Sequence, residues 1–73
     1  MPLETVESPL PGKILKVGVK VGDKIDDSGE ICTIEAMKME TPILSTVSGT
    51  ITEVAVSEGQ AVKAGDKIAV IEY

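Results

Sequence analysis

Two copies of one pattern, 37 residues apart, make up almost the whole chain. When each of residues 1–36 is compared with the residue 37 positions later, nine pairs are identical. Average residue usage in soluble proteins would give about two identities by chance. The identical pairs are Ser8/Ser45, Gly12/Gly49, Ile14/Ile51, Val17/Val54, Val19/Val56, Gly22/Gly59, Ile31/Ile68, Ile34/Ile71 and Glu35/Glu72. Neither copy can bury its apolar face alone, so we expect the two to pack together as one domain spanning residues 1–73.

The local pattern within each copy is that of β-strands. Val17, Val19 and Val21 are in phase with a two-residue period, and residues 51–56 repeat the pattern in the second copy. Turn-forming residues recur every eight to twelve positions, and no ten-residue window free of Gly and Pro has a helical stripe. We predict four strands per copy, at 4–8, 12–17, 23–26, 31–36, 39–44, 49–55, 60–63 and 67–72. The predicted fold is all-β, a flattened barrel or sandwich of two four-stranded antiparallel sheets with pseudo-two-fold symmetry.

Four glycines occupy two equivalent positions in the copies. Gly22 and Gly59 lie in predicted turns, where we expect a positive φ. Gly12 and Gly49 begin the second strand of each copy, where we expect the neighbouring backbone to exclude a side chain.

The tetrapeptide Ala36-Met37-Lys38-Met39 lies where the first copy ends and the second begins. In the repeat Ala36 corresponds to Tyr73, so the chain end of one copy corresponds to a continuous hairpin in the other. We therefore expect the two termini to lie close together, with Lys38 at an exposed tip at the opposite end of the molecule. If the backbone at this tip is extended, Met37 and Met39 share one face and Lys38 takes the other.

The composition argues against several kinds of function. The chain has no His and one Cys, so a zinc site or a histidine-based catalytic site lacks its residues, which argues against catalysis by this chain alone. Twelve acidic residues against seven lysines give a net charge of −5, without the basic patch that nucleic acids or anionic membranes require. Cys32 lies in an apolar run and is predicted to be a buried, unpaired residue. With no signal peptide and no membrane-length apolar segment, we expect a cytoplasmic location.

A lysine at an exposed tip is better suited to modification than to catalysis. A water-exposed lysine amine is almost fully protonated at neutral pH, and a nucleophilic lysine needs desolvation or a cationic neighbour. Lys38 instead has Glu35 and Glu40 near it in sequence. A separate enzyme that modifies the lysine needs only its exposure and a recognisable frame of neighbours.

The segment Glu35-Ala36-Met37-Lys38-Met39-Glu40 resembles the attachment motif of biotinyl domains, the carboxyl carriers of biotin-dependent enzymes. Other segments also resemble this family over nearly the whole chain, in both copies of the repeat. They are Pro9-Leu10-Pro11-Gly12, Val21-Gly22-Asp23-Lys24-Ile25, Ser48-Gly49-Thr50-Ile51 and Glu58-Gly59-Gln60-Ala61-Val62.

The resemblance implies that Lys38 is the biotin acceptor, joined by an amide bond to biotin's carboxyl group by a biotin protein ligase. It further implies that biotin shuttles carboxylate between a biotin carboxylase site and a carboxyltransferase or decarboxylase site. In that role the domain is a non-catalytic carrier and binds no metal. Met37, Met39 and Ala36 match the residues that frame the lysine for partner enzymes.

The segment from Ile14 to Ile25 has no room for the inserted thumb loop that carriers of bacterial acetyl-CoA carboxylase often have. The chain therefore looks more like the thumbless carriers of pyruvate or propionyl-CoA carboxylases, decarboxylase pumps or transcarboxylases. Two alternatives stay open. A lipoyl domain has the same fold but typically Asp-Lys-Ala at the hairpin, and an unmodified β-sandwich could serve as an interaction module.

Overall fold

The computed structural model describes residues 2–73, which form eight β-strands. The strands are β1 (Leu3–Glu7), β2 (Gly12–Val17), β3 (Lys24–Ile25), β4 (Glu30–Ala36), β5 (Met39–Leu44), β6 (Gly49–Val54), β7 (Ala61–Val62) and β8 (Lys67–Glu72). All eight were predicted from the sequence, and every bound agrees within one residue. No helix in the described range is long and apolar enough to cross a membrane.

The strands form two four-stranded antiparallel sheets, with the orders β1-β8-β6-β3 and β5-β4-β2-β7. Replacing each strand of the first sheet by its equivalent in the other copy produces the second sheet in the same order. The predicted pseudo-two-fold arrangement is therefore confirmed. Each sheet nevertheless takes two strands from each copy, because β3 pairs with β6 and β2 pairs with β7. The two copies are thus interleaved, so neither could form its sheet without the other.

The core between the sheets consists mainly of isoleucines. Six are at most 1% exposed, and they form three pairs that the repeat relates: Ile14/Ile51, Ile31/Ile68 and Ile34/Ile71. Burying an isoleucine side chain contributes roughly 1.5–3 kcal/mol relative to leaving it exposed. Cys32 and its equivalent Ala69 lie in the same core, and the predicted burial of Cys32 is confirmed.

Two serines are buried among the described residues. Ser8 and Ser45 occupy equivalent positions just after β1 and β5 and are 2% and 3% exposed. The Ser8 hydroxyl donates a hydrogen bond of 2.6 Å to the carbonyl of Leu10, and the Ser45 hydroxyl donates to the carbonyl of Val47. Burying a hydroxyl without a partner is costly, so these bonds allow both serine side chains to be buried. The sequence showed that Ser8 and Ser45 are equivalent in the repeat, but it did not show that their hydroxyls form these hydrogen bonds.

Both glycine predictions are confirmed. Gly22 and Gly59 have φ of 95° and 85°, in the left-handed region that glycine adopts without steric cost. A Cβ atom on Gly12 would lie 2.6 Å from the carbonyl oxygen of Glu35, and one on Gly49 would overlap the carbonyl oxygen of Glu72. Gly12 therefore lets the end of β4 lie close to the start of β2, and Gly49 lets the end of β8 lie close to the start of β6.

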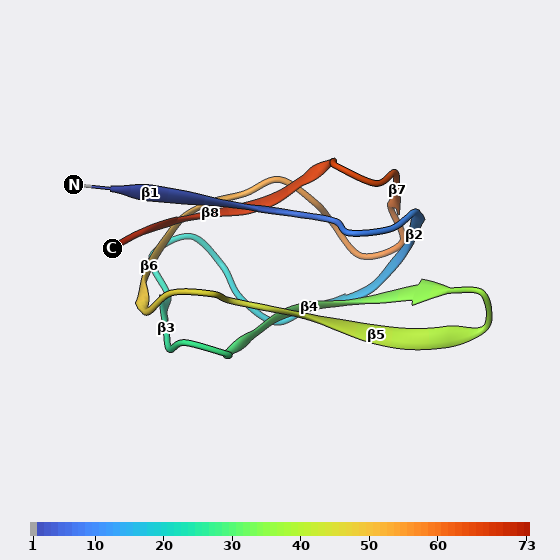
Figure 1. Cartoon of the computed structure of the whole chain (residues 1–73), viewed down its shortest axis with the longest axis horizontal. Coiled ribbons are helices and arrows are strands. Elements are labelled where there is room, and N and C mark those ends of the chain that lie inside the picture. The colour runs from blue at the N-terminus through green and yellow to red at the C-terminus, as the bar shows by residue number, and fades with distance from the viewer. Residues whose placement is uncertain (1) are drawn as a thin grey trace.

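The molecule is elongated, with dimensions of 36 × 17 × 17 Å, and the β4–β5 hairpin forms one end (Figure 1). The chain termini lie at the other end, where the amide of Tyr73 donates a 3.1 Å hydrogen bond to the carbonyl of Pro2. Met1 lies outside the described residues. The predicted separation between the termini and the tip that carries Lys38 is confirmed.

Candidate functional site: the β4–β5 hairpin tip

The β4–β5 hairpin closes through a turn of only two residues, Met37 and Lys38. Ala36 and Met39 are the last paired residues of the two strands. Met37 and Lys38 have positive φ angles of 54° and 65°. A two-residue hairpin loop with positive φ at both positions is a type I′ turn, whose backbone twist matches the twist of antiparallel strands.

The expectation based on an extended tip is therefore wrong for Met37 and Lys38. Both residues lie in the turn itself, so the alternation of side chains along a strand does not apply to them. The reason is geometric, because β4 and β5 are paired up to Ala36 and Met39 and the chain must reverse within two residues. Only Met39 belongs to a strand, and its side chain lies on the same face as that of its partner Ala36.

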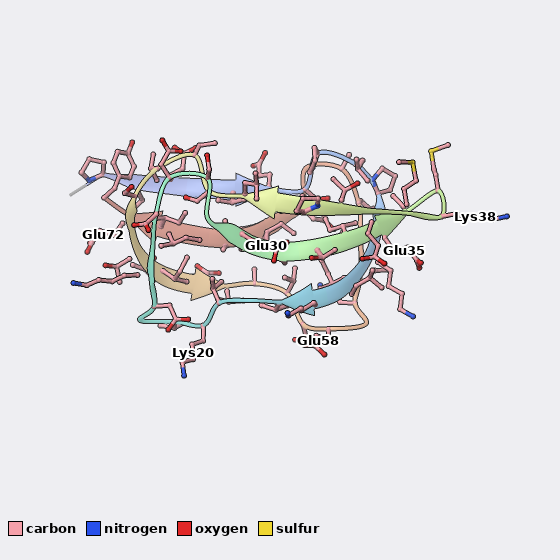
Figure 2. The ribbon with its side chains drawn as sticks, turned by 90° about the horizontal axis from the view of Figure 1, so that it is seen from below. Lys20, Glu30, Glu35, Lys38, Glu58 and Glu72 are labelled. Carbon is pink, nitrogen blue, oxygen red and sulfur yellow. The ribbon has the colours of Figure 1, made fainter. Side chains whose placement is uncertain are left out.

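The turn projects the chemistry-bearing side chains into solvent. Met37 is 95% exposed and Met39 is 69% exposed. Lys38 is also exposed, and Figure 2 shows its amine pointing outward along the long axis of the molecule. The tip therefore presents two large apolar side chains and an amine together in solvent.

Ala36 anchors the base of the turn. Its side chain is half-buried, and a Cβ atom placed on Gly12 would come within 3.3 Å of the Ala36 Cβ. The start of β2 thus lies directly against the end of β4, which fixes the point from which the turn departs. The sequence indicated that Gly12 must lack a side chain but did not show that it lies beside the β4–β5 hairpin.

Two glutamates and a second lysine lie near Lys38. Glu35 and Glu40 are opposite each other across the hairpin, and Lys13 is opposite Glu35 on the other side of β4. Within residues 2–73 the one ion pair, 2.8 Å between Lys67 and Glu53, lies elsewhere, so no carboxylate holds the Lys38 amine in place. The amine is therefore presented on a side chain that is free to move.

The family model described as biotin-requiring enzyme matches residues 4–71. The chain belongs to this family. It is similar to the biotin carboxyl carrier protein of Streptococcus mutans, with 45% identity over 67 residues, covering 92% of this chain and 52% of that protein. It is also similar to the biotinylated protein TB7.3 homolog of Mycobacterium leprae, with 41% identity covering 93% of this chain and 96% of that one.

A solved structure shows the same fold inside a much larger protein. The crystal structure of the Kluyveromyces lactis urea carboxylase matches with a TM-score of 0.91 and 33% identity, covering 99% of this chain and 6% of that one. This member of the biotin-requiring enzyme family thus spans about half the length of the S. mutans relative and a small part of the urea carboxylase.

The tip meets the requirement of a biotin-requiring family member for a covalent attachment point. Attachment needs a primary amine that a second enzyme can reach, and Lys38 supplies one at the end of the molecule. No pocket is found in the part of the chain that the structure describes, and a covalently tethered group does not need one. The described residues also contain no cluster of three or more His, Cys, Asp or Glu that could hold a metal ion.

The thiol of Cys32 is far less available to a reagent in solvent than the Lys38 amine. It is 1% exposed, and burial, together with the negative charge of nearby Glu30, raises the pKa of its thiol to about 11. Since the thiolate is the reactive form, the thiol is inert at neutral pH. Cys32 is therefore not available for modification in the folded chain at neutral pH.

Proposed function

We propose that this chain is a biotin carboxyl carrier domain and that Lys38 is the residue to which biotin is attached. The observation that carries the proposal is the position of Lys38. It lies in the two-residue turn that joins the two copies, with exposed Met37 and Met39 on either side. Membership of the biotin-requiring enzyme family supports the same chemistry.

The chain contributes an amine, and a partner enzyme contributes the activation. Nζ of Lys38 forms an amide bond with the carboxyl carbon of biotin after a biotin protein ligase has activated that carboxyl group. The ammonium must lose its extra proton before attack, and the solvated tip has no group that would remove it, so the ligase must supply the base. Amide formation removes one positive charge and makes the net charge of −5 more negative by one unit.

Once attached, biotin supplies the carboxyl-transfer chemistry between the active sites of a biotin-dependent carboxylase, decarboxylase or transcarboxylase. The domain's own contribution is to position it. Tethering replaces a bimolecular encounter with an intramolecular one and raises the effective concentration at partner sites. Both described chain ends lie at the far end of the 36 Å molecule, so a polypeptide joined there would leave Lys38 uncovered (Figure 1).

The neighbours of Lys38 form the recognition frame in this proposal. Met37 and Met39 present flexible, polarisable thioethers that can adapt to the surface of more than one partner. Ala36 keeps the base of the turn small where it lies against Gly12. The unpaired, buried Cys32 is consistent with a reducing compartment, and we place the domain in the cytoplasm.

Intact mass measurement tests the proposal. The purified chain is incubated with ATP and either a biotin protein ligase plus biotin or a lipoate ligase plus lipoate. We expect addition of one biotinyl group in the first reaction and no addition in the second. Addition of lipoyl alone would identify a lipoyl-type carrier, and no addition in either reaction would favour an unmodified interaction module.

A further inference from the structure

The sulfur atoms of the described residues differ sharply in their access to solvent. Met37 and Met39 are 95% and 69% exposed, whereas Cys32 is 1% exposed. Apart from Met1, which lies outside the described residues, these are the only sulfur-containing residues in the chain. A peroxide that reaches the folded domain from solvent therefore meets the two thioethers at the tip before it meets the thiol.

We propose that Met37 and Met39 form a redox modification site that controls attachment at Lys38. The inference rests on the proposed function of Lys38 as the biotin acceptor. In the reaction, each thioether sulfur takes one oxygen atom from a hydroperoxide. The S–CH₃ group becomes a sulfoxide, the sulfur is oxidised by two electrons, and hydrogen peroxide is reduced to water. Reductases specific for methionine sulfoxide reverse the change.

The two methionines are the immediate chain neighbours of the acceptor lysine. Met37 and Lys38 are the two turn residues, and Met39 follows directly, so each methionine Cα lies about 3.8 Å from that of Lys38. Oxidation converts a flexible apolar side chain into a polar one with a strong hydrogen-bond acceptor. A ligase surface that packs against the thioethers would then have to desolvate that acceptor.

The fold does not depend on these two side chains. Neither methionine belongs to the core, and the residue equivalent to Met39 in the first copy is Pro2. Oxidation therefore changes the surface that a partner recognises while the sheets and the core remain intact. A lower ligation rate in the oxidised but folded chain would therefore report altered recognition and not unfolding.

The test compares ligation before and after controlled oxidation. The unbiotinylated Cys32→Ala chain is treated with hydrogen peroxide, the peroxide is removed with catalase, and peptide mass mapping locates the added oxygens. Initial rates are then measured with biotin protein ligase, biotin and ATP. We expect one oxygen on each of Met37 and Met39, an unchanged circular dichroism spectrum, and kcat/KM lower by about tenfold, as expected when a recognition contact must bury an unpaired polar group. Methionine sulfoxide reductases should restore the rate.

A second variant tests whether the effect comes from these two sulfurs. The chain with Met37→Leu and Met39→Leu is compared only with itself, and its rate should be the same before and after peroxide. An oxidised chain that is ligated as fast as the reduced chain would overturn the inference, as would an equal loss of rate in the leucine variant. The untreated chain serves as the separate check on the proposed function, since it must acquire biotin for Lys38 to be the acceptor.

Discussion

Ser28 and Gly65 occupy the same position in the two copies and have the same unusual backbone conformation, with φ of 69° and 90°. Each is the third residue of a four-residue turn closed by a backbone hydrogen bond. Gly29 donates to Asp26 over 2.8 Å in one turn, and Asp66 donates to Lys63 over 3.0 Å in the other. The left-handed conformation costs glycine little but is unfavourable for serine.

Replacing Ser28 with glycine should therefore stabilise the domain. The expected gain is about 0.5–1 kcal/mol, because the relief of backbone strain exceeds the added entropy of the unfolded chain. In a domain of this size that gain corresponds to a rise in Tm of a few degrees, roughly 2–8 °C, measurable by thermal denaturation. The equivalent change in the other copy, Gly65→Ser, should lower Tm by a similar amount. Equal Tm values for all three chains would show that the strain at Ser28 is negligible.

At the Met37–Lys38 turn, a change that raises stability should abolish the proposed function. Asn-Gly is the preferred sequence of a type I′ turn, whereas Met37 and Lys38 adopt positive φ at a cost. The double variant Met37→Asn and Lys38→Gly should therefore gain about 1 kcal/mol in unfolding free energy, measured by denaturant titration. The same variant should fail to acquire biotin. A loss of stability would show that the native tip is held by contacts that outweigh the conformational cost.

The strands could be predicted closely because the information is local. The alternation of apolar and polar residues identifies each strand, and the turn residues Gly, Pro and Asp define where it begins and ends. Because each strand has an equivalent in the other copy, the sequence gives two independent indications of its position. The pairing could not be predicted in the same way. Nothing in the two-residue strand Lys24–Ile25 shows that it pairs with β6 of the other copy.

The candidate site was predicted in its position but not in its conformation. The repeat placed Lys38 at a tip opposite the termini, which depends only on the symmetry of the two copies. Met-Lys is not a typical type I′ sequence, so the positive φ angles at the turn had no local signal. They follow from the pairing of Ala36 with Met39, a property of the assembled sheet.

Cys32 should make the stability of the domain depend on alkaline pH. Burial and the charge of Glu30 raise the pKa of its thiol from 9.0 to about 11, so the folded chain keeps this proton after the unfolded chain has lost it. The stabilisation is fully present below pH 9 and is lost as pH rises from 9 towards 11, by at most about 3 kcal/mol. The measurement is the unfolding free energy at several pH values between 8 and 11.

The matched control is Cys32→Ala, since alanine occupies the equivalent core position as Ala69. All other ionisable groups are common to both chains. The unfolding free energy of wild type should therefore fall relative to that of Cys32→Ala as the pH rises. If that difference is the same at pH 8 and pH 11, Cys32 does not contribute to the pH dependence.

Site mapping by tandem mass spectrometry can decide whether biotin is attached at Lys38 and at no other lysine. All seven lysines are exposed, so accessibility alone would not favour any one of them. After reaction with biotin protein ligase, biotin and ATP, we expect a single biotinyl group on Lys38 and none on the Lys38→Arg chain, which should fold with the same circular dichroism spectrum. Biotin on another lysine, or undiminished incorporation into Lys38→Arg, would contradict it.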